Sequence, residues 1–230
     1  MIFSKGRRRA PRHAATDSTE PDPATDPLDD RGDDEIPEIG PYDADDAPED
    51  VERLDLGSLK IPAVPGVEVR IQADENGAIQ QVVLVHGDSA LQIGAFAAPR
   101  SEGIWEEVRA EIADSLRKDG VRTTTAAGEY GTELLGRVPT PNGPMDVRFV
   151  GVDGPRWMVR AVYQGPAAAD PAAAGPLREA LRGLVVDRGK EAMPVREPLP
   201  LRLPREVAEQ AQRQAAAEGG ANGAVPGGSV

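Results

Sequence analysis

The sequence predicts an α+β fold in which an antiparallel sheet of about seven strands is flanked by two helices, in the order β-β-β-α-β-β-β-β-α. Three observations predict this class. Apolar and polar residues alternate in seven short segments, which is the period of a half-buried strand. Glycine-containing turns separate most of these segments. Two further segments carry apolar residues at helical spacing.

The clearest strand signal lies in residues 145–163. Apolar residues alternate there along two arms: Met145, Val147 and Phe149, then Trp157, Val159, Ala161 and Tyr163. Asp153-Gly154 between the arms predicts a tight hairpin turn, because glycine tolerates the positive φ that such turns require. One of the two tryptophans lies here, so we expect this hairpin at the centre of the core.

The other strands are expected on both sides of a first helix. Alternation predicts strands over 67–71, 79–85 and 91–96, with turns at 75–78 and 86–89, and later strands over 121–126 and 132–138. The first helix is expected over 104–118, with Ser101 as its N-cap and Gly120 at its end. The second helix is expected to begin at Pro176, to carry Leu181 and Val185 on one face, and to end by Gly189.

Composition divides the chain into four parts. Residues 1–53 are predicted to be a disordered tail with a basic start and then an acidic stretch, because they hold too few large apolar residues to form a core. Residues 54–190 form the α+β domain. Residues 191–204 are a proline-rich extension expected to pack on the domain, and residues 205–230 are a frayed helix followed by a glycine-rich disordered tail.

Charge and composition exclude several classes of function. Residues 1–50 carry −9 of the net charge of −13, so the remainder is only mildly acidic and we do not expect the domain to bind nucleic acid. The absence of cysteine excludes disulfides and zinc–thiolate sites. No apolar run is long enough for a membrane span, and no signal peptide opens the chain. We expect a cytoplasmic protein.

The residues offer little catalytic chemistry. His86 has Asp88 and Ser89 beside it, but side chains so close in a turn point in different directions and do not form a triad. Glu129 and Glu133 are candidates for an acid–base pair, although the glycines around them indicate an ordinary loop. No phosphate-binding loop occurs. We therefore predict no catalytic residue, no metal and no cofactor.

The candidate binding patch consists of Arg148, Arg160 and Trp157 in the central hairpin. The two arginines are expected on the face opposite the aromatic residues, where together with Asp146 they would bind an anion or an acidic partner. Cross-strand charge pairs on a solvent-facing sheet are the alternative. Trp157 and Trp105 either line a ligand pocket or fill the core between helix and sheet.

Residues 54–204 resemble an actinobacterial family of unknown function. Three phrases carry the resemblance: V-D-G-P-R-W-M-V-R-A-V at 152–162, L-V-V-D-R-G at 184–189, and A-M-P-V-R-E-P-L-P-L-R-L-P at 192–204. The element order also resembles the Mog1/PsbP-like architecture. Neither resemblance implies an activity or a catalytic residue, because folds of one topology serve many functions.

These observations favour an uncharacterised cytoplasmic, non-catalytic binding, accessory or regulatory module whose partner is a protein. A hydrolase that uses carboxylates in a groove between helix and sheet is the first alternative. Weak nucleic-acid contact through Arg7–Arg9 and Arg12 is the second. The sequence leaves the oligomeric state open.

Overall fold

The computed structural model describes residues 39–74 and 78–203 of the chain. It confirms the α+β class: a seven-stranded antiparallel sheet carries helices, and a smaller four-stranded sheet accompanies it. Residues 1–38 of the tail expected over 1–53, the whole tail expected over 205–230, residue 204 of the proline-rich extension and the centre of the turn at 75–78 lie outside the described residues.

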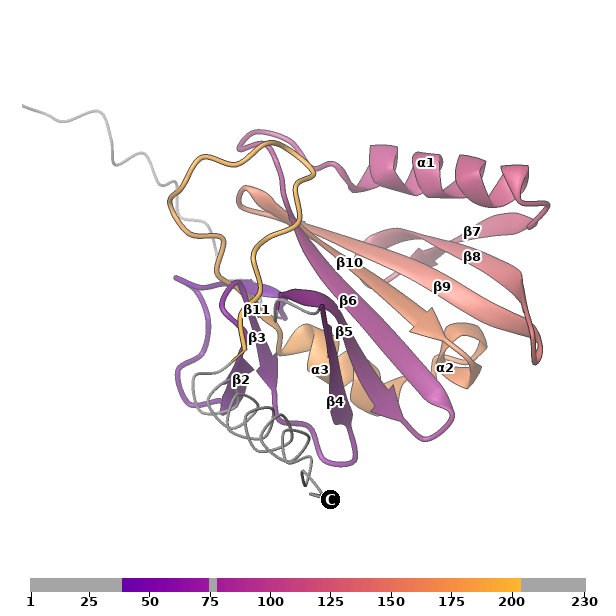
Figure 1. Ribbon diagram of the computed structural model, residues 1–230, viewed down its shortest axis with the longest axis horizontal. Coiled ribbons are helices and arrows are strands. Elements are labelled where there is room, and N and C mark those ends of the chain that lie inside the picture. Colours follow the sequence, from indigo (N-terminus) through magenta and orange to yellow (C-terminus); the bar gives the residue numbers. More distant parts are fainter. Residues whose placement is uncertain (1–38, 75–77, 204–230) are drawn as a thin grey trace, which may run out of the picture. The chain divides into compact units, whose positions relative to one another are not determined.

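The strand of the large sheet that comes last in the sequence, β10 (Trp157–Gln164), lies at the centre of the sheet. In spatial order the sheet consists of β4 (Glu68–Ala73), β5 (Ile79–His86), β6 (Ser89–Ala97), β10, β9 (Gly143–Gly154), β8 (Gly131–Thr140) and β7 (Thr123–Gly128). Figure 1 shows β10 between two meanders, β4-β5-β6 and β7-β8-β9. Every neighbouring pair is antiparallel. The predicted order of strands around the first helix is therefore confirmed.

The small sheet brings both ends of the described chain together. Its spatial order is β1 (Tyr42–Asp43), β11 (Val185–Val186), β3 (Leu59–Pro62) and β2 (Arg53–Asp55), and β1 runs parallel to β11. The backbone N–H of Tyr42 donates to the carbonyl of Leu184 at 2.8 Å. The boundary predicted at residue 54 is thus too late. Local composition does not reveal that residues 42–43 belong to the fold, because their hydrogen-bond partners lie at the far end of the sequence.

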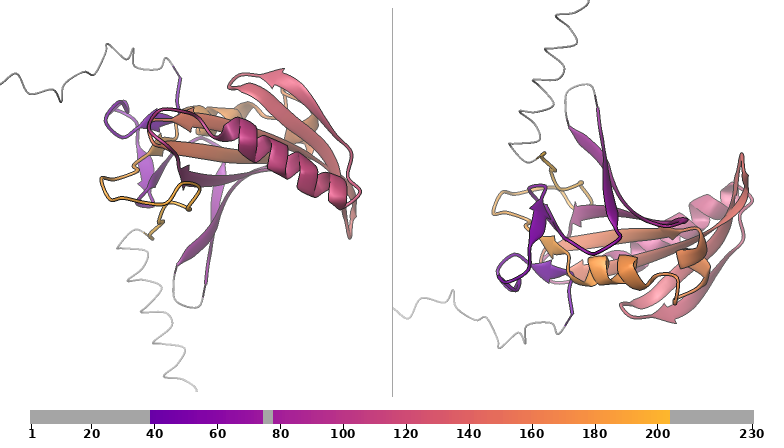
Figure 2. Two further views of the ribbon diagram at one scale, coloured as in Figure 1. Left: turned by 90° about the horizontal axis from the view of Figure 1, so that it is seen from above. Right: turned by 90° about the horizontal axis from the view of Figure 1, so that it is seen from below.

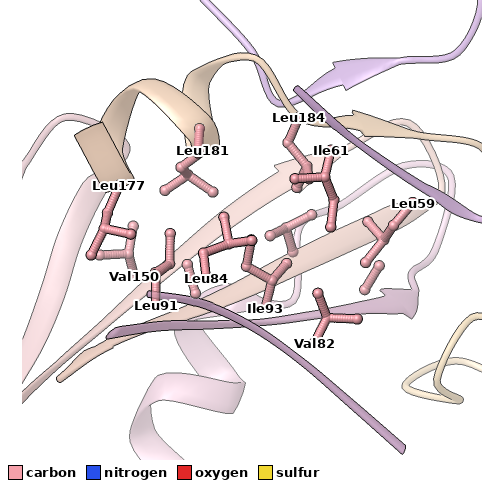
Figure 3. Close-up of a cluster of buried hydrophobic side chains, with 14 of the residues drawn as sticks. Leu59, Ile61, Val82, Leu84, Leu91, Ile93, Val150, Leu177, Leu181 and Leu184 are labelled. Carbon is pink, nitrogen blue, oxygen red and sulfur yellow. The ribbon is translucent and has the colours of Figure 1, made fainter. Parts of the chain in front are cut away.

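One face of the large sheet is covered by α2 (Pro166–Ala169), α3 (Gly175–Arg182) and the small sheet. Figure 3 shows leucines of α3 lying over residues of β5, β6 and β9. This main cluster includes Leu59, Ile61, Val82, Leu84, Leu91, Ile93, Val150, Leu177, Leu181 and Leu184, all at most 3 % exposed. The second helix is shorter than predicted: it ends before Gly183, and Val185 belongs to β11.

The opposite face carries α1 (Trp105–Lys118). Trp105 packs on β9 at Gly151, where a Cβ would overlap the indole ring. Its Nε1 donates to the carbonyl of Thr132 on β8 at 2.8 Å. The predicted end of this helix is confirmed, since Gly120 has φ +77° just beyond it.

The start of α1 differs from the prediction, because Ser101 does not cap it. The carboxylate of Asp153 on β9 instead accepts from the backbone N–H of Ile104 at 2.9 Å and of Trp105 at 3.2 Å. These N–H groups have no partner inside the helix. A negative charge there also faces the positive end of the helix dipole. The helix is therefore capped by the strand on which it packs.

The turn of the central hairpin also differs from the prediction. Gly154 pairs with Trp157, so Pro155 and Arg156 form the turn in place of Asp153 and Gly154. Proline suits the first turn position, and Arg156 takes the second with φ +62°. A Cβ at Gly154 would overlap the ring of Trp157. Glycine is thus needed at 154 for close packing.

The proline-rich segment forms backbone hydrogen bonds with β6. Towards the C-terminal end of β6, the last residue pair between β5 and β6 is Val82 with Ile93. Figure 2 shows the β4–β5 hairpin turning away from the rest of the sheet. Beyond that point Arg196 N–H donates to the carbonyl of Ala97 at 2.7 Å, and Leu199 N–H to that of Ala95 at 2.9 Å. The segment occupies the position beside β6 that β5 leaves.

Replacing Asp153 with alanine is expected to lower the free energy of unfolding by about 1 kcal/mol, because two N–H groups of α1 lose their acceptor. Urea denaturation measures the change. Asp153→Asn keeps an oxygen acceptor and should retain most of the stability. Ser101→Ala is the control, since Ser101 is exposed and makes no hydrogen bond among the described residues. Equal losses at residues 101 and 153 would contradict this account of the cap.

Leu199→Ala should lower the free energy of unfolding by about 2–3 kcal/mol, because it empties a buried site. Leu199 is 3 % exposed, whereas Val195 in the same segment is 50 % exposed. Val195→Ala therefore serves as the matched control and should change stability by less than about 0.5 kcal/mol. A stability loss confined to Val195→Ala would show that the segment does not pack in this way.

Candidate functional site

The register of the β9–β10 hairpin places Arg148 and Arg160 on opposite faces of the sheet. Tyr163 faces Arg148, and Arg160 faces Gly151. Residues that face each other across two antiparallel strands share a face, and successive residues of one strand alternate between faces. Arg148 shares the face of Tyr163, its partner on β10. Arg160 lies three residues before Tyr163 on the same strand, and residues an odd number apart point to opposite faces. The two arginines therefore point to opposite sides of the sheet. The predicted patch of Arg148, Arg160 and Trp157 is therefore not one surface.

Trp157 belongs to the core and not to a pocket. It is 1 % exposed and lies in the main cluster. Its Nε1 donates to Oδ2 of Asp43 at 2.8 Å. This bond ties β1 to the centre of the sheet, so Trp157 positions the N-terminal strand.

Arg148 shares the face of Trp157 but lies at the other end of the hairpin, where its partners come from three elements. Its guanidinium lies 4.5 Å from the ring centroid of Tyr163, donates to the carbonyl of Ala167 at 2.9 Å, and has one nitrogen 3.6 Å from Oε2 of Glu133. The side chain is largely buried. These contacts join β8, β10 and α2, while Nε of Arg148 is buried without a hydrogen-bond partner among the described residues.

Glu133 is the buried acid of the described residues, with 7 % exposure. A separation of 3.6 Å from Arg148 is too long for a hydrogen bond. Burial raises the pKa of Glu133, the positive charge of Arg148 opposes that rise, and Glu129 adds to it. A Cβ at Gly128 would overlap the carboxylate. The absence of a side chain at Gly128 therefore leaves room for the carboxylate of Glu133. The glycine at 128 was a sequence signal for a buried Glu133, whereas we interpreted it above as a sign of an ordinary loop.

Glu129 and Glu133 have different partners. Oε1 of Glu129 accepts from Arg182 at 2.6 Å, which ties the β7–β8 turn to α3. The hydroxyl of Tyr130 in the same turn donates to the carbonyl of Gly40 at 2.7 Å. The turn therefore fixes α3 and the N-terminal segment. No groove described below is lined by either glutamate.

His86, Asp88 and Ser89 do not form a triad. Nδ1 of His86 lies 2.9 Å from the carbonyl of Gly66, while the Ser89 hydroxyl accepts from the backbone N–H of Ala167 at 3.0 Å. The serine is buried and the aspartate is exposed. This agrees with the expectation that the three side chains of the turn point apart.

The α1 side of the large sheet is only half covered. α1 contacts β7, β8 and β9, and Figure 1 shows no described helix over β4, β5 and β6. We call this half the open face. Register places accessible or half-buried residues of β4, β5, β6 and β10 on it, among them Glu68, Arg70, Gln72, Gln81, Val83, Val85, Ala90, Gln92, Gly94, Phe96 and Arg160. Near the β5–β6 turn it is hollowed by a shallow groove of about 300 Å³.

Arg160 is the one charged residue of the central strand β10. It faces Gly94 on β6 and Gly151 on β9, and the rings of Phe96 and Trp105 lie over these two glycines. Its guanidinium lies over Phe96, 5.1 Å from the ring centroid. Among the described residues it has no ion pair or hydrogen bond. Burial lowers the pKa of Arg160, which reflects a cation partly withdrawn from water.

A second groove, of about 400 Å³, lies between the small sheet and β4. Its lining is entirely apolar and includes Leu54, Ile61, Val64 and Val67. In the described part of the chain, no three His, Asp or Glu residues gather as metal ligands would. The same residues form no helix with the length and apolarity needed to cross a bilayer.

Glu133→Gln is expected to change how stability depends on pH. Because the folded-state pKa of Glu133 is raised, the folded protein binds more protons than the unfolded chain, and stability falls as pH rises through this range. Between about pH 4 and about pH 7 the glutamine variant should therefore gain stability relative to the parent. Thermal unfolding at several pH values measures this. Glu102→Gln, at an exposed position, controls for the lost charge, and a difference independent of pH would contradict the assignment.

Comparison with known proteins places this fold in a family. A family model described as "Protein of unknown function (DUF3710)" matches residues 40–210. The match begins at the residue whose carbonyl Tyr130 binds, and it spans both sheets and the segment along β6. None of the curated proteins compared with the chain matches it. The chain therefore belongs to the DUF3710 family, whose function is unknown.

Proposed function

We propose that the protein is a non-catalytic accessory module that binds a protein partner on the open face, with Arg160 holding a carboxylate of that partner. The observation that carries this proposal is the half-buried guanidinium of Arg160, which lacks an acceptor among the described residues. A cation partly removed from water has lost hydration and gained no counter-ion. An incoming carboxylate supplies both the charge and the hydrogen-bond acceptors.

The surroundings of Arg160 support a planar, two-pronged contact. Arg160 faces Gly94 on β6 and Gly151 on β9, and aromatic rings cover both glycines: Phe96 lies over Gly94 and Trp105 over Gly151. Phe96 supports the guanidinium from one side. Stacking on an aromatic ring orders the long side chain before a ligand arrives, and two parallel N–H groups match the two oxygens of a carboxylate.

The charge of the open face favours a protein partner over nucleic acid. Arg70, its other cation, is paired with Glu68 at 3.0 Å. The face therefore offers one unpaired cation beside apolar side chains such as Val83 and Val85. Such a surface fits a single acidic residue flanked by apolar ones. A polyanion requires several basic contacts.

A hydrolase is the second candidate, and Glu133 is the observation that favours it. A carboxyl group with a raised pKa is what a general acid requires. Arg148 and Gly128, however, lie against this group, and Glu133 is only 7 % exposed. Nucleic-acid contact by Arg7–Arg12 concerns residues outside the described part of the chain.

We further propose a cytoplasmic location, an actinobacterial source and a relationship to the Mog1/PsbP-like architecture. The lack of cysteine supports the location. Abundant alanine, arginine and glycine with few lysines support a source of high GC content. Helices beside an antiparallel sheet support the architectural relationship.

Arg160→Ala in the full chain is expected to reduce partner recovery at least tenfold, because loss of a charge-assisted contact is worth about 1.5–3 kcal/mol. The measurement is affinity purification of tagged chains from the native host, with quantitative mass spectrometry. Full chains are required, since residues 42–53 belong to the fold. Arg160→Lys keeps the charge but loses the planar fork and should give intermediate recovery.

Arg100→Ala is the matched control, since Arg100 is exposed and has no ion pair among the described residues. Circular dichroism would verify that each variant is folded. Equal recovery of the same partners by the parent and by Arg160→Ala would reject the open face as the binding surface. Failure of the parent to retain any partner would reject the module itself and favour the hydrolase.

A further inference from the structure

The two edges of the large sheet differ in how they are protected. An edge strand exposes unpaired N–H and C=O groups, and natural proteins guard such edges with charges, prolines or bulges. The edge strand β4 carries Glu68 and Arg70, and its register shifts between Gln72 and Ala73. This edge has the usual guards against pairing with another strand.

The other edge, β7, has none of these guards. Its six residues are three threonines, two alanines and a glycine, without charge or proline. Pairing with β8 runs from Thr123–Gly136 to Gly128–Gly131 with no shift. Five of the six residues are exposed. Among the described residues, the only hydrogen bonds of β7 are those to β8.

We propose that β7 pairs antiparallel with β7 of a second copy of this chain, which makes one sheet continuous across a two-fold axis. Such an interface is self-complementary, because both copies contribute the same strand. The small side chains let the backbones approach, and threonine is favoured in strands and in cross-strand pairs. The free backbone groups of each edge then serve as partners for the other.

The charges at the ends of β7 favour this antiparallel arrangement. Arg122 precedes the strand and Glu129 follows it. Antiparallel pairing therefore brings the strand end that carries Arg122 to the end that carries Glu129 of the other copy, twice in each dimer, with the two side chains on opposite faces of the joined sheet. Arg122 has no ion pair among the described residues, and only one oxygen of Glu129 is used by Arg182. A parallel arrangement would place like charges together.

The proposed dimer is independent of the function proposed above. The open face lies over β4, β5, β6 and β10, whereas the joined edge is at the opposite end of the sheet. Pairing through β7 therefore leaves Arg160 of both copies accessible. Failure of partner binding and failure of dimerisation would be separate results.

Sedimentation velocity of the full chain, up to about 0.2 mM, tests the proposal, since strand pairing of limited area gives a weak dimer. The parent should reach the mass of two chains. Thr125→Lys places like charges across the axis and should keep the mass of one chain. Gln72→Lys adds the same charge at the β4 edge and should dimerise like the parent. Circular dichroism would verify that each variant is folded.

A second measurement uses the absence of cysteine from the natural chain. In a two-fold antiparallel pair one residue faces its own copy, so one of the single-cysteine variants Thr125→Cys and Ala126→Cys, the one whose residue lies on the axis, should form a disulfide-linked dimer on oxidation. Gln72→Cys should not. A parent that stays at the mass of one chain, a dimer that survives Thr125→Lys, or crosslinking only through residue 72 would each overturn the proposal. So would capture of a foreign strand on β7 by a parent that does not self-associate.

Discussion

β10 forms hydrogen bonds to β6 along one edge and to β9 along the other, and both of its faces are buried. The rest of the structure depends on this strand. The leucines of α3 pack over the face of Val159 and Ala161, and the α1 layer packs on Met158. A strand covered on both sides needs apolar residues at consecutive positions. Its one charged residue, Arg160, is for that reason conspicuous.

The two arginines of the hairpin have different kinds of contacts. Arg148 contacts a carboxylate, a carbonyl and an aromatic ring, and so it joins elements. Arg160 has an aromatic ring and no acceptor among the described residues. A guanidinium carries five N–H donors. Because none of these donors meets an acceptor among the described residues, water or a bound group supplies the acceptors of Arg160.

The strands were readable from the sequence because their alternation is local, and the helix over 104–118 because its apolar spacing is local. The cap of α1 was not readable, since Asp153 lies 49 residues from Ile104. Tyr42 pairs with Val185, and no local pattern announces such a pairing. That Arg148 and Arg160 lie on opposite faces could have been predicted from the sequence. A hairpin with a two-residue turn always pairs an even-numbered residue with an odd-numbered one, so two even-numbered residues on its two strands never share a face.

The fluorescence of the two tryptophans can report separately on the two sides of the large sheet. Trp105 lies in the α1 layer and Trp157 lies beneath the opposite layer, each with its indole nitrogen bonded to a different segment. Indole emission shifts when the ring meets water. In versions that keep one tryptophan, fluorescence would follow the loosening of α1 or the release of the N-terminal strand separately. The order in which the two sides of the sheet come apart is thus open to direct observation.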